Sequence, residues 1–284
     1  MNSARRLNSF PTPRQAGRLR RLGATLTLVA MSLSTAPVGA EVREFSVPQL
    51  EALGRAIYEQ NRRTRIASEV MHENYDAEKM GINGWVTEGD SAHLLVRFVH
   101  RDATGATAVL DAKFDQLLLP EFAPAASPVL TPMQAAQVAA RETAEPHLSN
   151  PCEALYDNAV VPDPDGSGFL VYAIAVAKAR TDVMIGGHRR FTISADGTTF
   201  EHDDALTTSC LSAPLAKLQQ SDGTKGVAVR ANLSNTPLEI HVYLSLVYKI
   251  PLYVVTRDLK MWKVENGTMR VIRNQPGIEP TAGQ

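Results

Sequence analysis

Three stretches of the chain carry the apolar spacing and the start signals of helices. After Ser46, a residue that can cap a helix, apolar residues recur at helical spacing over residues 47–57, and this helix is predicted to reach about residue 71. Thr131-Pro132 starts a second helix, which is unusually rich in alanine. Thr236-Pro237-Leu238-Glu239 starts a third helix with a capping-box pattern.

Alternating and fully apolar runs predict β-strands. The alternating or β-rich runs are residues 85–88, 94–101, 106–114, 191–195, 198–202, 227–232, 252–256, 261–265 and 269–272. Residues 168–177 are apolar on both faces, which is typical of a central strand covered on both sides. The small face of this strand, which includes Ala173, is expected to pack against the alanine-rich helix. Pro120, Pro124 and Pro128 mark a connector.

Asp196-Gly197 favours a two-residue hairpin turn between two of these strands. Pairing Ala195 with Thr198 then places Ile193 opposite Phe200, and Phe191 opposite His202. This register brings the large apolar side chains onto one face of the hairpin.

Together these elements predict an α+β fold, in which antiparallel β-sheets pack with about three helices. One α+β domain is expected over residues 41–273. The proline-rich connector leaves open a division into two subdomains that meet near residues 120–130. Residues 274–284 are predicted to form a flexible tail.

The first 40 residues have the pattern of a signal peptide. Six arginines and no acidic residue precede an apolar run over residues 22–36, which is shorter than the ~20 residues of a membrane-spanning helix. Val38-Gly39-Ala40 supplies the small residues that signal peptidase prefers, so cleavage is expected near Ala40. A retained N-terminal anchor is the alternative. After cleavage the protein is expected to be periplasmic or secreted, without stable membrane insertion.

Cleavage would change the charge of the protein. The whole chain has 29 basic and 30 acidic residues, and loss of the six N-terminal arginines leaves 23 basic residues and a net charge of about -7. An acidic protein is repelled by phosphate backbones and anionic lipids, so nucleic acid is not an expected partner. An envelope protein or a small ligand is the expected class of partner.

Cys152 and Cys210 are the two cysteines of the chain. In an oxidising compartment an even number of cysteines favours one intrachain disulfide. A nucleophilic cysteine with a histidine partner is the alternative, but neither cysteine lies in a recognisable catalytic motif.

Residues 152–210 and 236–254 resemble a set of uncharacterised exported proteins of Gram-negative bacteria. The resemblance is carried by the runs Val160-Val161-Pro162-Asp163-Pro164-Asp165-Gly166, Phe169-Leu170-Val171-Tyr172, Gly186-Gly187-His188-Arg189-Arg190-Phe191, Ser194-Ala195-Asp196-Gly197, Thr236-Pro237-Leu238-Glu239-Ile240-His241-Val242 and Pro251-Leu252-Tyr253-Val254. It covers most of the chain after residue 40, and it is clearest in the second half. The resemblance implies that the protein is exported. It assigns no activity and no catalytic residue to the chain.

Two groups of acidic residues are candidate metal ligands. Asp163 and Asp165 open a run with the oxygen spacing of a calcium loop, but the twelfth position is Ile174 in place of the bidentate glutamate, so a hairpin turn is the favoured alternative. Glu201, His202 and Asp203 form the densest cluster of acids and imidazole, for which a solvated strand end is the alternative.

No complete catalytic constellation is present in the sequence. His241 and Ser245 lie four residues apart on the third helix, without an acid to orient the imidazole. Phosphate loops and dinucleotide fingerprints are absent, so no cofactor is predicted. The balance favours a non-enzymatic binding or accessory role in the cell envelope. The alternatives are a periplasmic hydrolase whose active-site residues are scattered in sequence, and a divalent-cation-binding protein.

Overall fold

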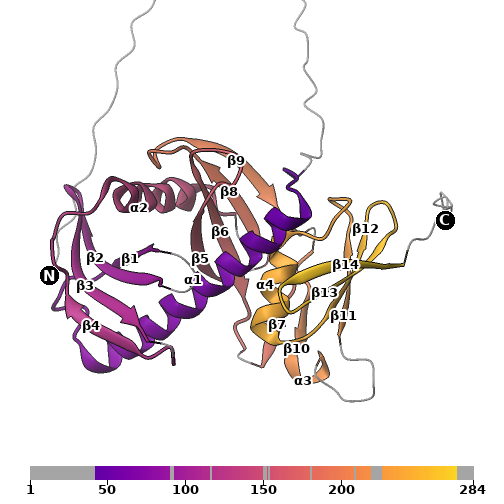
Figure 1. The fold of residues 1–284 in the computed structure, drawn as a ribbon, viewed down its shortest axis with the longest axis horizontal. Coiled ribbons are helices and arrows are strands. Elements are labelled where there is room, and N and C mark those ends of the chain that lie inside the picture. The colour runs from indigo at the N-terminus through magenta and orange to yellow at the C-terminus, as the bar shows by residue number, and fades with distance from the viewer. Residues whose placement is uncertain are drawn as a thin grey trace, which may run out of the picture. The chain divides into compact units, whose positions relative to one another are not determined.

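Helices and β-sheets alternate along the part of the chain that the structure describes (Figure 1). This structure is a computed structural model, which describes residues 42–273 apart from 90–92, 116, 150–151, 153, 180, 208 and 219–225. The predicted signal peptide and the predicted C-terminal tail lie outside these described residues. Among the described helices, none is both long and apolar enough to cross a membrane.

The described strands form three four-stranded sheets and one two-stranded ribbon. In order across each sheet, the first contains β1 (Gly84–Glu88), β2 (Leu95–Asp102), β3 (Gly105–Phe114) and β4 (Pro120–Pro124); the second contains β5 (Leu155–Pro162), β6 (Phe169–Val176), β8 (Arg189–Ile193) and β9 (Phe200–Ala205); the third contains β11 (Val227–Ala231), β12 (Leu252–Thr256), β13 (Met261–Glu265) and β14 (Thr268–Arg273). The ribbon pairs β7 (Asp182–Met184) with β10 (Ser212–Pro214).

The helices are α1 (Val47–Asn74), α2 (Pro132–Ala144), the four-residue α3 (Leu215–Leu218) and α4 (Glu239–Tyr248), and a 3-10 turn, η1 (Glu145–His147), follows α2. The predicted α+β fold with largely antiparallel sheets is therefore confirmed. One pair of strands is parallel: β11 and β12, which α4 connects. The expected division into two subdomains near residues 120–130 stays a prediction.

Helix α1 contributes to two separate parts of the core. Its first half packs Leu50, Leu53 and Ile57 into the largest apolar cluster, together with α4 and the inner face of the third sheet. Its second half packs Ala67 and Met71 on the first sheet. Gly54 permits the close approach of the two helices, because a Cβ there would lie 2.4 Å from the Val242 Cβ.

The expected packing of the alanine-rich helix on the central strand is confirmed. Ala136, Ala140 and Ala144 of α2 share one apolar cluster with Ala173 and other odd-numbered residues of β6. The even-numbered Leu170, Tyr172 and Ile174 point into the larger core. Strand β6 is thus buried on both faces, as its continuous apolar sequence predicts.

The hairpin register is confirmed in part. Ile193 pairs with Phe200 as expected, but a bulge follows, so Thr192 lies opposite His202 and Phe191 lies opposite Asp203. The prediction of Phe191 opposite His202 is therefore wrong. It assumed strict one-to-one pairing of the two strands, and the bulge adds one residue to one strand. Gly197, with a φ of +79°, lets the turn touch α2, where a Cβ would lie 2.2 Å from the Ala136 carbonyl oxygen.

Two further expectations about boundaries need correction. Within the proline-rich connector, Pro120–Pro124 forms β4, an edge strand in which the proline positions are tolerated. The third helix begins at Glu239 with Leu238 as its N-cap, and His241 fills the capping role, since its Nδ1 accepts from the Leu238 N–H at 2.9 Å. The Glu239 side chain is instead bound to Arg190.

Two glutamine side chains close the free edges of the first and second sheets where β1 and β5 face each other. The Val160 N–H donates to Gln60 Oε1 (2.6 Å), and Gln60 Nε2 donates to the Val160 carbonyl (2.8 Å) and to Thr87 Oγ1 (2.6 Å). Gln137 makes the matching pair with the N–H and the carbonyl of Thr87. These bonds satisfy buried edge groups that would otherwise each cost about 1–3 kcal/mol. We call this line of contacts the β1–β5 seam.

The predicted disulfide is present. Cys152 and Cys210 are bonded, with their Cα atoms 5.3 Å apart and 58 residues apart in the sequence. The bond joins the segment that leads into β5 to the segment that follows β9. Closing a loop of this length is worth about 4 kcal/mol in the chain-entropy model.

Candidate functional site

A cavity of about 510 Å³ lies at one end of the β1–β5 seam. It is lined by residues from α1, α2 and both sheets. The apolar residues of the lining are Met71, Ile82, Trp85, Phe98, Ala144, Leu148, Val171, Ala173 and Phe191. The polar side chains are those of Ser68, His72, Asn83, Arg101, Arg141, Glu145, Tyr156, Asp157 and Asn158, and Gly84 and Tyr172 complete the lining. An apolar wall with a few polar groups is the usual composition of a small-molecule pocket, and the volume is in the usual range. We call this space the seam cavity.

Arg141 is the residue of the seam cavity whose charge is least compensated. From α2 it reaches both sheet edges: its Nη1 donates to the Trp85 carbonyl of β1 (2.6 Å), and its Nε donates to Asn158 Oδ1 of β5 (2.7 Å). The guanidinium lies 4.1 Å from the centroid of the Trp85 ring. Both hydrogen-bond acceptors are neutral, so they hold the guanidinium in place without cancelling its charge.

The third nitrogen of this guanidinium, Nη2, is buried and has no hydrogen-bond partner among the described residues. Burial lowers the pKa of Arg141 to about 10, with a further decrease from the positive charge of Arg101. The side chain is therefore still a cation at neutral pH. The Arg141 residue is half-buried, but its buried and unused Nη2 donor is costly unless something binds it.

Arg101 also lines the seam cavity. Its Nη1 contacts Glu142 Oε1 at 3.2 Å, while its Nε is buried and has no partner among the described residues. Arg101, Arg141 and Glu142 thus leave one positive charge uncompensated. Glu145 and Asp157 line the cavity too, but both are exposed to solvent, where salt screens their charges.

A second cavity, of about 620 Å³, lies at the other end of the seam. Its polar lining is already in use: Gln60 and Gln137 bond the strand edges, and Gln134 Nε2 donates to Glu88 Oε2 at 2.6 Å. The seam cavity is smaller, but it is the one that holds unused donors. We therefore take it as the candidate functional site.

Comparison with family models, with curated proteins and with solved structures finds no match for this chain. Its function must therefore be argued from the geometry of its own residues.

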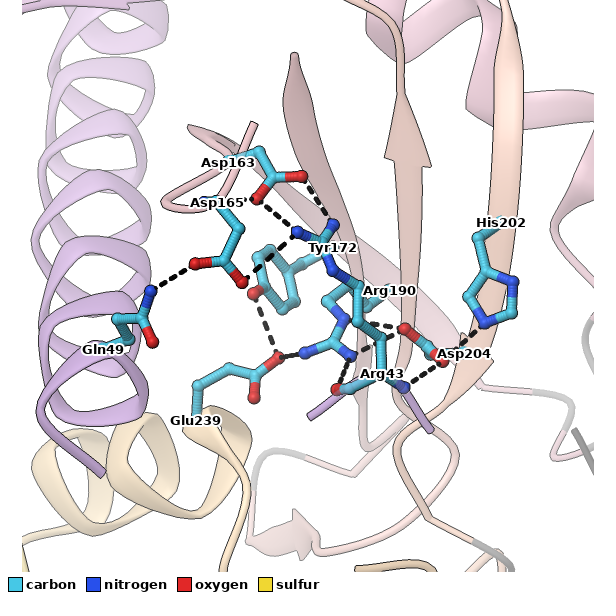
Figure 2. A network of polar contacts seen from close by, with 9 residues as sticks. All are labelled: Arg43, Gln49, Asp163, Asp165, Tyr172, Arg190, His202, Asp204 and Glu239. Atoms are coloured by element: carbon cyan, nitrogen blue, oxygen red, sulfur yellow. Dashed lines mark hydrogen bonds and ion pairs between the residues drawn. The ribbon is translucent and has the colours of Figure 1, made fainter. Parts of the chain in front are cut away.

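A buried polar network lies on the opposite face of β6 (Figure 2). Arg190 is fully buried between two carboxylates: its Nε and Nη2 donate to Asp204 Oδ2 (2.9 and 2.7 Å), and its Nη1 donates to Glu239 Oε1 (2.6 Å). The Tyr172 hydroxyl donates to the same Glu239 oxygen at 3.0 Å. Burial opposes the charge of Arg190, but Glu239, Tyr172 and Asp204 outweigh burial and raise its pKa.

The same network holds the segment that precedes α1. The Arg43 N–H donates to Asp204 Oδ1 (3.0 Å), and the Arg43 carbonyl accepts from Arg190 Nη2 (2.6 Å). The Phe45 ring lies within 4.8 Å of both guanidinium groups. Tyr172 is also among the residues that line the seam cavity, whereas Arg190, Asp204 and Glu239 line neither that cavity nor the second one. The charged groups of the network therefore bind segments of the chain together.

The first pair of predicted metal ligands, Asp163 and Asp165, lies beside an arginine in this structure. Asp163 forms a two-pronged ion pair with Arg43 (2.5 and 2.9 Å), and Asp165 lies 3.6 Å from the same guanidinium. Arg43 lowers the pKa of Asp163 against the opposing effect of burial. In this structure the positive charge beside the predicted calcium ligands Asp163 and Asp165 is therefore that of Arg43.

The second predicted cluster is divided among different contacts. Asp203 pairs with Arg189, His202 Nε2 lies 3.0 Å from Asp204 Oδ1, and Glu201 is exposed. No group of three or more described His, Cys, Asp or Glu side chains has the geometry of a metal site. Divalent-cation binding by these residues stays a prediction.

His241 and Ser245 do not form a catalytic pair. The Ser245 hydroxyl donates to the Val242 carbonyl at 2.8 Å, and His241 Nδ1 accepts from the Leu238 N–H. Both residues are buried. Burial lowers the pKa of His241 to about 4, so its imidazole is neutral at physiological pH.

No sequence pattern singles out Arg101 or Arg141. Arginine on an alanine-rich helix or near a strand end is typical of solvent-facing positions, and nothing local separates these two from the rest. Arg141 stands out only in the folded structure, because its partners Trp85 and Asn158 come from two different sheets.

Proposed function

We propose that this protein binds a small molecule in the seam cavity and has no catalytic role. The observation that carries the proposal is a cavity of about 510 Å³ with a mainly apolar lining and two incompletely bonded arginines. Its walls come from rigid elements, because α1, α2, β5 and β6 all pack into apolar clusters. The β1–β5 seam keeps the two sheet edges apart without leaving their backbone groups unpaired.

The proposal includes export to the periplasm. The arginine-rich and then apolar pattern of residues 1–40 supports it, and so does the disulfide, since disulfides persist in oxidising compartments. The resemblance to exported proteins of Gram-negative bacteria agrees with the same location. An acidic, exported carrier or sensor of a small ligand is consistent with all three.

Export can be tested on the protein itself. The chain is expressed in a Gram-negative host, and the protein recovered from the periplasm is measured by intact mass spectrometry. We expect a chain that begins at Glu41 and contains no free thiol. A chain that keeps residues 1–40, or that stays in the cytoplasm, contradicts the location.

Ligand binding can be tested by filling the cavity. Leu148 is half-buried, follows η1 and lines the seam cavity, so Leu148→Trp places an indole in the proposed site. Leu246→Trp is the matched control, because Leu246 is also half-buried but lines the second cavity. The probe is the neutral dye Nile red, whose fluorescence rises in apolar surroundings.

The wild type is expected to bind the dye saturably at one site. Leu148→Trp should weaken binding by at least about tenfold, equivalent to 1.4 kcal/mol, while Leu246→Trp should change it little. Far-ultraviolet circular dichroism establishes that both variants are folded. If the dye does not bind, or if both variants weaken it equally, the seam cavity is not the site.

A further inference from the structure

The donors that the seam cavity leaves unused identify the chemistry of its ligand. Arg141 Nη2 and Arg101 Nε are buried N–H groups of cationic side chains, and neither has a partner among the described residues. Each belongs to a residue of the cavity lining. Both nitrogens have almost no accessible surface, so the two guanidinium groups must shift slightly to offer these N–H groups to the two oxygens of a carboxylate.

The charge balance indicates a single negative charge. Glu142 compensates Arg101 at 3.2 Å, and the hydrogen-bond partners of Arg141 are a backbone carbonyl and an amide oxygen. One guanidinium charge therefore remains. Burial is the main cause of the lowered pKa of Arg141; the positive charge of Arg101 adds to it and Glu142 opposes it. An anion between the two arginines would relieve the repulsion between them.

The rest of the lining indicates an apolar body. Met71, Trp85, Phe98, Leu148 and Phe191 belong to two apolar clusters or to the half-buried side chains packed on them. A molecule that is small and polar throughout would leave these apolar side chains in contact with water. An elongated or flat apolar group would bury them and remove their apolar surface from water, which favours binding.

We propose that the ligand of the seam cavity is an amphipathic monocarboxylate, with its carboxylate on Arg141 and Arg101 and its apolar body against the cavity wall. This inference rests on the proposed function and names the class of ligand that the same site selects. Arg141 is the specificity-determining residue, because it is the guanidinium without a carboxylate partner among the described residues.

The test compares three probes with the same ten-carbon chain and different head groups: decanoate, decanol and decyltrimethylammonium. Each is titrated calorimetrically, below its micellar concentration, into the wild type, Arg141→Met and Arg65→Met. Arg65 is the matched charge control, since it is exposed on α1 and does not line the cavity.

The wild type is expected to bind decanoate at least about tenfold more tightly than decanol, because the carboxylate accepts charge-assisted hydrogen bonds that the hydroxyl group cannot match. Arg141→Met should reduce this preference to within about threefold while decanol binding changes little. Arg65→Met should keep the preference. If Arg141→Met fails to fold, Arg101→Met takes its place, because it retains both contacts of Arg141 to β1 and β5. Arg101→Met should lower the affinity for decanoate severalfold.

Two results separate this inference from the proposed function. If decanoate and decanol bind the wild type equally, or the cation binds best, the carboxylate assignment is overturned, while Nile red binding that Leu148→Trp weakens still supports a ligand site. If none of the probes binds and the dye does not bind either, both the assignment and the proposed function are overturned.

Discussion

Arg190→Met is expected to unfold most of the protein at neutral pH. The Arg190 side chain is fully buried, and the two carboxylates that it bridges, Asp204 and Glu239, are at most 1% exposed. Methionine would leave both carboxylates without this cation. Breaking one buried ion pair costs about 3–5 kcal/mol, and whole domains are stable by only about 5–15 kcal/mol. The measurement is urea denaturation followed by circular dichroism.

The neighbouring residue supplies a matched control. Arg189 pairs with Asp203 in the same way that Arg190 pairs with Asp204, but the side chains of Arg189 and Asp203 are 19% and 28% exposed. Arg189→Met should therefore cost no more than about 1 kcal/mol. The triple variant Arg190→Met, Asp204→Asn, Glu239→Gln should recover part of the loss, because it removes the buried charges together. Equal effects of Arg190→Met and Arg189→Met would contradict the structural role of the network.

The network also explains how the first described residues are held. Arg43 is bound through its backbone to Asp204 and Arg190, and through its side chain to Asp163. The Phe45 ring packs against both guanidinium groups. The segment before α1 is thereby fixed to the second sheet and, through Arg190 and Glu239, to α4. Loss of Arg190 should release this segment together with the core, which is why a large and cooperative effect is expected.

Local periodicity accounts for the elements that the sequence predicts well. Helix α1, the alternating strands of the first sheet and the continuous apolar run of β6 each carry their pattern within one segment. Strand β5 carries no such pattern: it contains Asp157 and Asn158, ends at Pro162 and exposes Leu155. It is a strand because it pairs along its full length with β6, which is a tertiary effect.

The functional features depend on residues far apart in the sequence. Arg190 is 147 residues from Arg43 and 49 residues from Glu239. The local pattern from Thr236 to Glu239 predicts a capping box. In the structure Glu239 instead binds Arg190, because a buried guanidinium attracts a carboxylate more strongly than a helix N-terminus does. The seam cavity likewise exists only where β1, β5 and α2 meet, so no single segment predicts it.

The stability of the protein is expected to fall steeply as pH drops from about 6.5 to 4. His188 and His241 are buried, and their pKa values are lowered to about 3 and about 4. Burial is the main cause for both, and for His188 the proximity of His241 adds to it. In the unfolded chain both imidazoles would titrate near 6.5. The unfolded state therefore binds protons in this range that the folded state does not bind.

The sign of the effect follows from this difference in bound protons. Above pH 6.5 both histidines are neutral in both states, and they add no pH dependence. Below pH 6.5 each favours the unfolded state by about 1.4 kcal/mol per pH unit, until the pH reaches its folded pKa. Chemical denaturation at a series of pH values from 7 to 4 measures the slope.

Asparagine variants test whether these two histidines are responsible. His188 Nδ1 accepts from the Ala175 N–H and His241 Nδ1 accepts from the Leu238 N–H, and the amide oxygen of asparagine can take the place of Nδ1 in each contact. Neither Nε2 atom makes a well-formed hydrogen bond among the described residues, and the weaker backbone contact of His188 with Met184 is an interaction that asparagine would lose. His188→Asn, His241→Asn should flatten the slope between pH 6 and pH 4.5, where the unfolding of the wild type takes up nearly two more protons. An unchanged slope in the double variant would assign the acid sensitivity to the buried carboxylates instead.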